Sequence, residues 1–246
     1  MTLEACAELV SRGDPDRFAA VMAAPVAARA RLFPLYAFNL EVARAPWVSK
    51  EPMIGEMRLQ WWRDVVAEPG PRAHEVAGPF HALIQEAGLP LDVIDRLIEA
   101  RVQDVYGVPF EDRVAFDAYL DATAGGLMWL ASACVGGRDE AGARGLGWAL
   151  GLANYLRAVP ELEARGRHPL PDGQAEAIQD LAKDGLQRLA TAKGRVPMAA
   201  ALAAWQARGL LRQVMADPRV VADGAMGLSE FGRRGWLVWA AFTGRI

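Results

Sequence analysis

Pairs of carboxylates four residues apart recur along the chain, and such pairs lie on one face of an α-helix. Two pairs on facing helices could hold Mg²⁺, which prefers oxygen ligands and keeps several of its waters. The pairs are Asp64–Glu68, Asp95–Glu99, Asp117–Asp121, Glu176–Asp180 and Asp180–Asp184. Because the chain has 30 acidic residues, this spacing alone does not single out a metal site. We expect most of these carboxylates on solvated helix faces or beside arginines.

Other residue types that perform catalysis are sparse and scattered. His74, His81 and His168 do not have the spacing of metal ligands. The sequence contains no P-loop, no dinucleotide-binding fingerprint and no nucleophile-elbow motif. Its only cysteines, Cys6 and Cys134, predict two reduced core thiols rather than a disulfide framework.

The composition is that of a globular chain large enough for a sizeable core. Of its 246 residues 52% are hydrophobic and 23% charged, and the formal net charge of -3 gives no support to nucleic-acid binding. We expect one domain, residues 1–246. The N-terminal stretch "MTLEACAELVSRGD" lacks a signal-peptide pattern, and no run reaches the roughly 18 apolar residues of a membrane span. These features predict a cytoplasmic protein.

Helical periodicity covers most of the chain, and no strand pattern appears. Asp14 is the expected N-cap of a helix that starts with Pro15, and Ser49 that of a helix with Pro52 in its first turn. Pro34 is expected to kink a helix over 26–45. Further helices are predicted at 78–87, 90–105, 112–135, 139–164, 173–193, 197–206, 208–216 and 227–242. These elements predict an all-α, single-domain helical bundle.

The stretch "EMRLQWWRDVVAE", Glu56 to Glu68, places two tryptophans beside several charges. Neighbouring helical residues point about 100° apart, so Trp61 and Trp62 face different surroundings. We expect Trp62 in the core. Arg58 lies one turn earlier on the same face, where it could pair with Glu41 or reach a ligand.

Two stretches resemble the squalene/phytoene synthase family of head-to-head prenyl transferases. They are "LFPLYAFNLEVARAPWVSKEPMIGEMRLQWWRDVV", from Leu32 to Val66, and "GLANYLRAVPELEARGRHPLP", from Gly151 to Pro171. The stretch "EDRVAFDAYLDATAGGLMWLASACVG" is similar to the middle helix of the family, where an Ala/Thr-Gly step permits close helix approach. The resemblance implies an isoprenoid-synthase bundle around a central, mostly apolar cavity.

In active members of that family, two aspartate-rich motifs hold Mg²⁺ against the substrate diphosphates. The resemblance places the first near Ala43 to Trp47, where this chain reads "ARAPW", and the second from Ala158 to Leu162, where it reads "AVPEL". Only Glu161 is acidic there, and Arg44 reverses the local charge. The resemblance therefore implies no metal ligands, no catalytic residue and no cofactor.

One branch of the family, which includes a mitochondrial assembly factor for respiratory complex I, also carries an "AFN…E" helix without the aspartates. It continues into an "E…IG.MR.Q.W" stretch, which Glu51 to Trp62 of this chain match. Candidate pocket or anion-binding residues implied by the resemblance are Tyr36, Asn39, Glu41, Arg44, Arg58, Asp104, Asn154, Arg157, Glu161 and Arg165.

The leading expectation is a non-catalytic protein that binds an isoprenoid or other lipid, or acts as an assembly factor. One alternative is an active prenyl transferase that uses Mg²⁺ and displaced acids such as Glu41, Asp104 and Glu161. Another is a protein-interaction scaffold with a filled cavity. The apolar run Gly235 to Phe242, with Arg233, Arg234 and Arg245 beside it, could dock on an anionic membrane surface or close the bundle. The former would place the protein at the periphery of the inner membrane.

Overall fold

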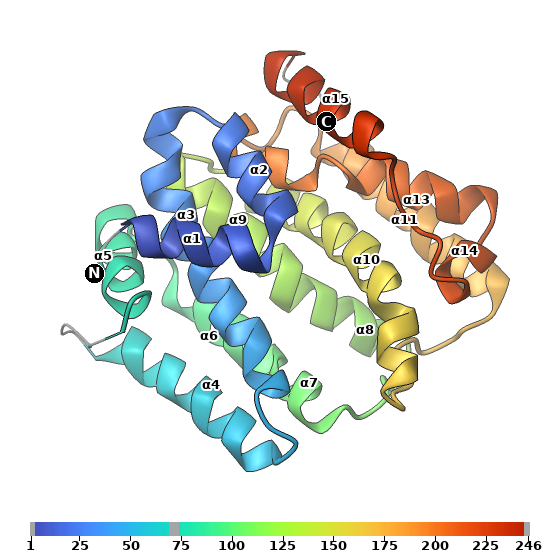
Figure 1. Ribbon diagram of the computed structural model, residues 1–246, viewed down its shortest axis with the longest axis horizontal. Coiled ribbons are helices and arrows are strands. Elements are labelled where there is room, and N and C mark those ends of the chain that lie inside the picture. Colours follow the sequence, from blue (N-terminus) through green and yellow to red (C-terminus); the bar gives the residue numbers. More distant parts are fainter. Residues whose placement is uncertain (1–2, 69–73, 244–246) are drawn as a thin grey trace.

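The computed structural model describes residues 3–68 and 74–243, and every regular element in these two ranges is helical (Figure 1). No helix among them is long and apolar enough to cross a bilayer. The elements are α1 (Leu3–Gly13), α2 (Pro15–Ala23), α3 (Val26–Arg44), η1 (Ala45–Trp47), α4 (Pro52–Ala67), α5 (Ala77–Ala87), α6 (Leu91–Ala100), α7 (Val102–Tyr106), α8 (Arg113–Leu120), η2 (Asp121–Gly125), α9 (Gly126–Cys134), α10 (Glu140–Ala164), α11 (Ala175–Ala192), α12 (Met198–Ala201), η3 (Leu202–Ala204), α13 (Ala207–Ala216), α14 (Arg219–Ala222) and α15 (Glu230–Thr243).

Helix α10 runs through the middle of the bundle. The N-terminal helices lie on one side of it, and α11, α13 and α14 lie on the other (Figure 1). Both α10 and α3 bury side chains around most of their circumference, as central helices do. The all-α bundle predicted from periodicity is confirmed.

Local capping chemistry explains how the N-terminal helices begin. The Asp14 carboxylate accepts a hydrogen bond from the Arg17 N–H, so the predicted N-cap of α2 is confirmed. The prediction of Ser49 as the N-cap of α4 was wrong. Because Pro52 restricts the residue before it to extended backbone, Glu51 takes the N-cap position, and the Ser49 hydroxyl only accepts from the Glu51 N–H.

Close approach between α10 and the segment before α9 depends on glycine. A Cβ on Gly147 would lie 2.3 Å from the carbonyl oxygen of Ala124, and one on Gly151 would lie 2.4 Å from the Ala124 Cβ. The close helix approach expected at the Ala/Thr-Gly step is thus present, and Gly147 and Gly151 of α10 form its other side.

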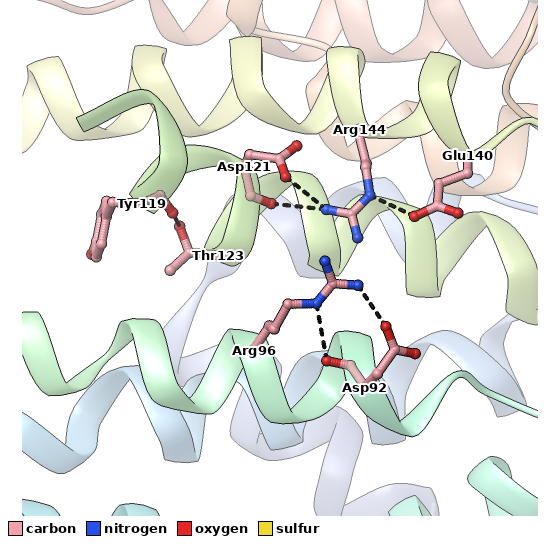
Figure 2. A network of polar contacts seen from close by, with 7 residues as sticks. All are labelled: Asp92, Arg96, Tyr119, Asp121, Thr123, Glu140 and Arg144. Atoms are coloured by element: carbon pink, nitrogen blue, oxygen red, sulfur yellow. Dashed lines mark hydrogen bonds and ion pairs between the residues drawn. The ribbon is translucent and has the colours of Figure 1, made fainter. Parts of the chain in front are cut away.

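The region predicted as one helix over 112–135 contains a π-helical segment, η2, between α8 and α9. The Thr123 hydroxyl donates to the Tyr119 carbonyl at 2.6 Å inside this segment (Figure 2). Arg144 of α10 donates to the Asp121 carboxylate at 2.9 Å, and its Nε donates to the Glu140 carboxylate (Figure 2). These contacts satisfy polar groups where the i→i−4 pattern is interrupted.

Two other predicted helices are also interrupted. The helix predicted over 90–105 divides into α6 and α7 at Arg101, whose side chain turns toward Asp104 and Tyr119. The helix predicted over 197–206 is a short α-helix that continues as the 3₁₀ turn η3. Pro34 lies inside α3 without ending it.

The tryptophan pair lies where the sequence indicates. Trp62 is fully buried and packs edge-on against Phe38, with ring centroids 5.3 Å apart. Trp61 is half-buried and faces a pocket on the surface of α4.

Aromatic side chains fill much of the middle of the bundle beside α10. Phe110, Phe116, Tyr119 and Tyr155 form a cluster with ring centroids 5.1 to 6.3 Å apart. The open space between this cluster and the end of α10 is about 20 Å³. The large central cavity expected from the resemblance is not found at this position, because the rings occupy it.

Candidate functional site

The two chain segments expected to carry the metal-binding motifs meet at Trp47, the last residue of η1. The guanidinium of Arg165 lies 4.7 Å from the centre of the Trp47 ring, and that of Arg167 lies 4.2 Å away. Trp47 remains 40% exposed, so this arrangement is at the surface. We call Trp47, Arg165 and Arg167 the Trp47–arginine cluster.

The cluster keeps positive charge available. Arg165 is paired with Glu161 one turn earlier on α10. Arg167, in contrast, forms no ion pair with any side chain that the structure describes. Its guanidinium therefore has hydrogen-bond donors free for an anion.

The other arginines predicted at these helix ends lie apart from the cluster. Arg44 is exposed, and its guanidinium packs over Gly13 at the end of α1. Arg157 makes a long contact of 3.7 Å with Asp16. Asn154 is exposed on α10.

The residues around these helix ends do not fit Mg²⁺. Magnesium needs several oxygen ligands, whereas the described side chains here are mainly guanidinium groups and an indole. In the described part of the chain no group of three or more His, Cys, Asp and Glu residues could hold a metal.

Each displaced acid required by the transferase alternative contacts an arginine. Glu41 Oε2 lies 3.5 Å from Arg58, and Asp104 Oδ2 lies 3.0 Å from Arg101. Glu161 is held by Arg165. An arginine beside each carboxylate disfavours a divalent metal ion there, because the guanidinium already neutralises the acid.

The spaced carboxylate pairs of the sequence show the same pattern. Asp95 and Glu99 both contact Arg63. Asp117 and Asp184 both contact Arg113, at 2.8 and 2.7 Å. These carboxylates join neighbouring helices, as expected for acids beside arginines.

A polar group lies between α7 and α8, next to the aromatic cluster. Arg101 donates to Asp104 at 3.0 Å and to the Tyr119 hydroxyl at 2.9 Å, and that hydroxyl donates to Asp104 at 2.9 Å. Burial opposes the charge of Arg101, yet its contacts with Tyr119 and Asp104 raise its pKa overall. Burial also raises the pKa of Tyr119 far above its ordinary value, so its hydroxyl stays protonated. The network holds Asp104 between the Arg101 guanidinium and the Tyr119 hydroxyl.

Two candidate residues belong to the core. Tyr36 is buried beneath Arg17, whose guanidinium lies 4.9 Å from the ring centre, and burial raises the pKa of Tyr36 to about 12. Asn39 is buried, and its side-chain oxygen has no hydrogen-bond partner among the described residues.

The structure thus distributes the ten predicted residues over separate places. It brings Glu161 and Arg165 to the Trp47–arginine cluster, and Glu41 and Arg58 to a pocket on α4. Sequence reasoning did not include Trp47 or Arg167 among the candidate residues, although both lie in or beside the matched motifs. The available signal was the pair Arg165 and Arg167, which follows the "AVPEL" stretch near the end of its helix.

A groove is lined by residues of α6, α7 and α8 and of the loop between α7 and α8. It has a volume of about 670 Å³, and its apolar lining includes Val102, Phe110, Ala115, Ala118 and Ala122. Phe110 also lines the small space that Arg167 borders, so the groove and the cluster adjoin the same ring.

Several curated proteins are similar in sequence to this chain. The assembly factor 6 of NADH dehydrogenase (ubiquinone) complex I from Bos taurus is 26% identical over 172 residues, which are 68% of this chain and 52% of that protein. The Homo sapiens protein is 25% identical over the same shares. The Drosophila melanogaster homolog is 29% identical over 167 residues, 63% of this chain and 50% of that protein. The chain spans about half the length of these relatives.

Solved structures of synthases have the same fold. A dehydrosqualene synthase in complex with ligand superimposes with a TM-score of 0.78 at 15% identity, over 98% of this chain and 96% of that one. The squalene synthase HpnC from Alicyclobacillus acidocaldarius gives a TM-score of 0.70 at 16% identity, over 92% and 95%. A profile for squalene/phytoene synthase matches residues 10–229, and the chain therefore belongs to the squalene/phytoene synthase family.

Proposed function

We propose that this chain is a non-catalytic, assembly-factor-like member of its family that binds an anionic lipid, such as an isoprenoid phosphate, at the Trp47–arginine cluster. The observation that carries the proposal is the stacking of Arg165 and Arg167, which follow the second expected motif, on Trp47, the last residue of the first. Arginine presents a rigid fork of donors that matches a phosphate group without a metal ion.

The indole and the neighbouring groove supply the rest of a lipid site. The Trp47 ring lies beneath the two guanidinium groups, and the alanines of α8 give the groove an apolar wall beside its charged lining residues, Arg96, Glu99 and Glu111. The groove volume of about 670 Å³ is within the range of ligand pockets. A lipid would place its phosphate at Arg167 and its chain past Phe110.

The same features argue against prenyl transfer. Ionisation of a prenyl diphosphate requires strong stabilisation of the leaving group, which metal ions supply in this fold family. Here the nearest acid, Glu161, is paired with Arg165. The space between Asp104, Tyr155 and Leu162 is also only about 20 Å³, which is too small for a prenyl chain.

The assembly-factor part of the proposal rests on the relatives. Those similar over 63% to 68% of this chain are named as assembly factors of NADH dehydrogenase complex I. We infer a comparable role here, in which the chain acts by binding a lipid or a partner protein and not by forming a reaction product.

The first experiment separates binding from catalysis. Purified protein is titrated with farnesyl diphosphate in EDTA, and the expected result is binding that Mg²⁺ does not strengthen and that Arg167→Glu abolishes. Arg188→Ala is the matched control, because Arg188 also stacks on a tryptophan, Trp148 at 4.3 Å, but between other helices. Farnesol, which lacks the phosphates, should bind far more weakly.

The same samples test for activity. With radiolabelled farnesyl diphosphate, Mg²⁺ and a reductant, we expect no product above a heat-killed control. Squalene, presqualene diphosphate or any other coupled product, or binding that depends on Mg²⁺, would contradict the proposal and favour the transferase alternative.

A second experiment tests the cellular role. Deletion of the gene in its host should lower the amount of assembled NADH dehydrogenase complex on native gels, and the wild-type gene should restore it. The Arg167→Glu variant should restore it less well than Arg188→Ala, provided that both accumulate equally. An unchanged complex after deletion would refute the assembly role.

A further inference from the structure

A second pocket, beside α4, shares no residue with the Trp47–arginine cluster or with the groove along α7 and α8. It has a volume of about 480 Å³ and is lined by Glu41, Ile54, Met57, Arg58, Trp61, Trp62 and His74. Glu41 comes from α3 and His74 from the segment before α5, while the others belong to α4. The pocket is therefore a separate site of this chain.

Three aromatic rings form its wall. Trp61 and Trp62 meet edge-to-face with centroids 4.9 Å apart. The His74 imidazole lies 5.0 Å from Trp61 and 5.4 Å from Trp62. The apolar side chains of Met57 and Ile54 extend this wall, and both are exposed. Indole faces carry partial negative charge and attract cations.

A carboxylate that is short of partners faces this wall. The Glu41 side chain is only 16% exposed, and its nearest cationic neighbours are Arg58 at 3.5 Å and the His74 Nε2 at 3.9 Å. Neither contact is a hydrogen bond, and no described residue donates one to Glu41. A carboxylate this buried gains from a close donor, because burial without a hydrogen bond costs free energy.

Arg58 is a loosely held occupant of the position next to Glu41. Its side chain is 42% exposed, so it can turn into solvent at little cost, as exposed ion-pair partners do. The Glu41 side chain is more confined, because only 16% of it is exposed. The fixed charge of the pocket is thus negative, and the positive charge is mobile.

We propose that this pocket binds an organic cation, an ammonium or guanidinium group on a compact apolar body. The nitrogen of the ligand takes the place of Arg58 and donates to Glu41, and its body packs on Trp61, Met57 and Ile54. An anion would instead meet a fixed carboxylate and the negative faces of the indoles, so the pocket discriminates against it.

This chemistry has two sources, a small amine or an arginine or lysine side chain of a partner protein. The probes distinguish them. 2-Phenylethylammonium represents a small amine, and N-acetylarginine amide represents a protein side chain. 2-Phenylethanol and 3-phenylpropionate present the same ring with a neutral and an anionic group.

The experiment uses the ¹⁵N-labelled full chain and follows the Trp61 indole N–H signal by NMR. That signal is assigned by its loss in Trp61→Phe. We expect saturable shifts with one or both cations, at least about tenfold weaker binding of the neutral probe, and no shift with the anion. The tighter of the two cations identifies the source.

Variants test the two charges separately. Glu41→Gln should weaken cation binding at least about tenfold, whereas Arg58→Gln should strengthen it by removing the competitor. Glu56→Gln is the matched control on α4, since Glu56 faces Tyr106 instead of the pocket, and it should bind as the wild type does. Thermal melting of each variant confirms that it is folded.

Three results would overturn the proposal. These are tighter binding of 3-phenylpropionate than of the cations, loss of binding in Arg58→Gln, or equal binding of all probes. None of these results depends on the Trp47–arginine cluster, so failure here leaves the proposed function unaffected.

Discussion

Replacement of Asp104 by asparagine tests whether the acids left in the middle of the bundle are structural. Asp104 accepts hydrogen bonds from Arg101 and from the Tyr119 hydroxyl. The substitution keeps the shape of the side chain but leaves the Arg101 guanidinium with no acidic partner in the described residues. The Nε atom of Arg101 already lacks a hydrogen bond among them, so the site has no spare acceptor.

The magnitude follows from burial. Side-chain exposures of 18% for Arg101 and 16% for Asp104 place the pair near, but not fully in, the interior. Breaking a buried ion pair costs about 3–5 kcal/mol, and partial exposure favours the lower end of that range, about 3 kcal/mol. For a chain of this size that loss corresponds to a melting temperature lower by about 6–12 °C.

Chemical denaturation and thermal melting of Asp104→Asn measure this loss. Asp92→Asn is the control, because Asp92 also pairs with an arginine of its own helix, Arg96, but is 70% exposed (Figure 2). It should change the free energy of unfolding by less than about 1 kcal/mol. A fully stable or stabilised Asp104→Asn variant would refute the reasoning. It would mean that Asp104 is held at a cost in stability, as functional acids often are, and would support a metal ligand.

Four further predictions rest on other parts of the structure. Trp62→Ala should destabilise the chain by about 3–5 kcal/mol in chemical denaturation, since the side chain is buried; an unchanged midpoint would contradict this. Gly147→Ala should cost about 1–3 kcal/mol through backbone overlap, whereas Gly145→Ala, with its nearest neighbour 4.0 Å away, should be neutral or gain up to about 1 kcal/mol in the same assay. Burial raises the pKa of the Cys134 thiol to about 12, so it should react with a thiol reagent at pH 8 only as the chain unfolds; fast labelling of the native protein would be inconsistent with this. Phe242 is 93% exposed, and Phe242→Ser should weaken flotation with anionic vesicles about tenfold if α15 docks on membranes; equal flotation would exclude this contact.

The last of these concerns a surface that the structure describes only in part. Trp236 and Trp239 of α15 stack with ring centroids 4.6 Å apart, and both are exposed. Paired indoles at a surface suit a membrane interface. The side chains of Arg233 and Arg234, and residue Arg245, which the sequence analysis also invoked, lie outside the described residues.

Sequence alone determined the elements and the family. Helical periodicity and the Asp14 cap depend on neighbours within a few residues along the chain. The family follows from the two matched stretches, and the profile match over residues 10–229 confirms it. The wrong N-cap prediction also had a local cause. At Ser49 the restriction that Pro52 places on its predecessor outweighed capping preference.

Only the tertiary structure decided which charges meet. Arg167 stacks on Trp47 across 120 positions of the chain, and Arg113 pairs with Asp184 across 71 positions. A 3.6-residue period tells which face of a helix is apolar but not which helix it meets, so sequence could not separate these residues into distinct sites. The aromatic cluster likewise depends on contacts among rings from α8, α10 and the loop before α8. This packing is a property of the assembled bundle, because no single helix contains it.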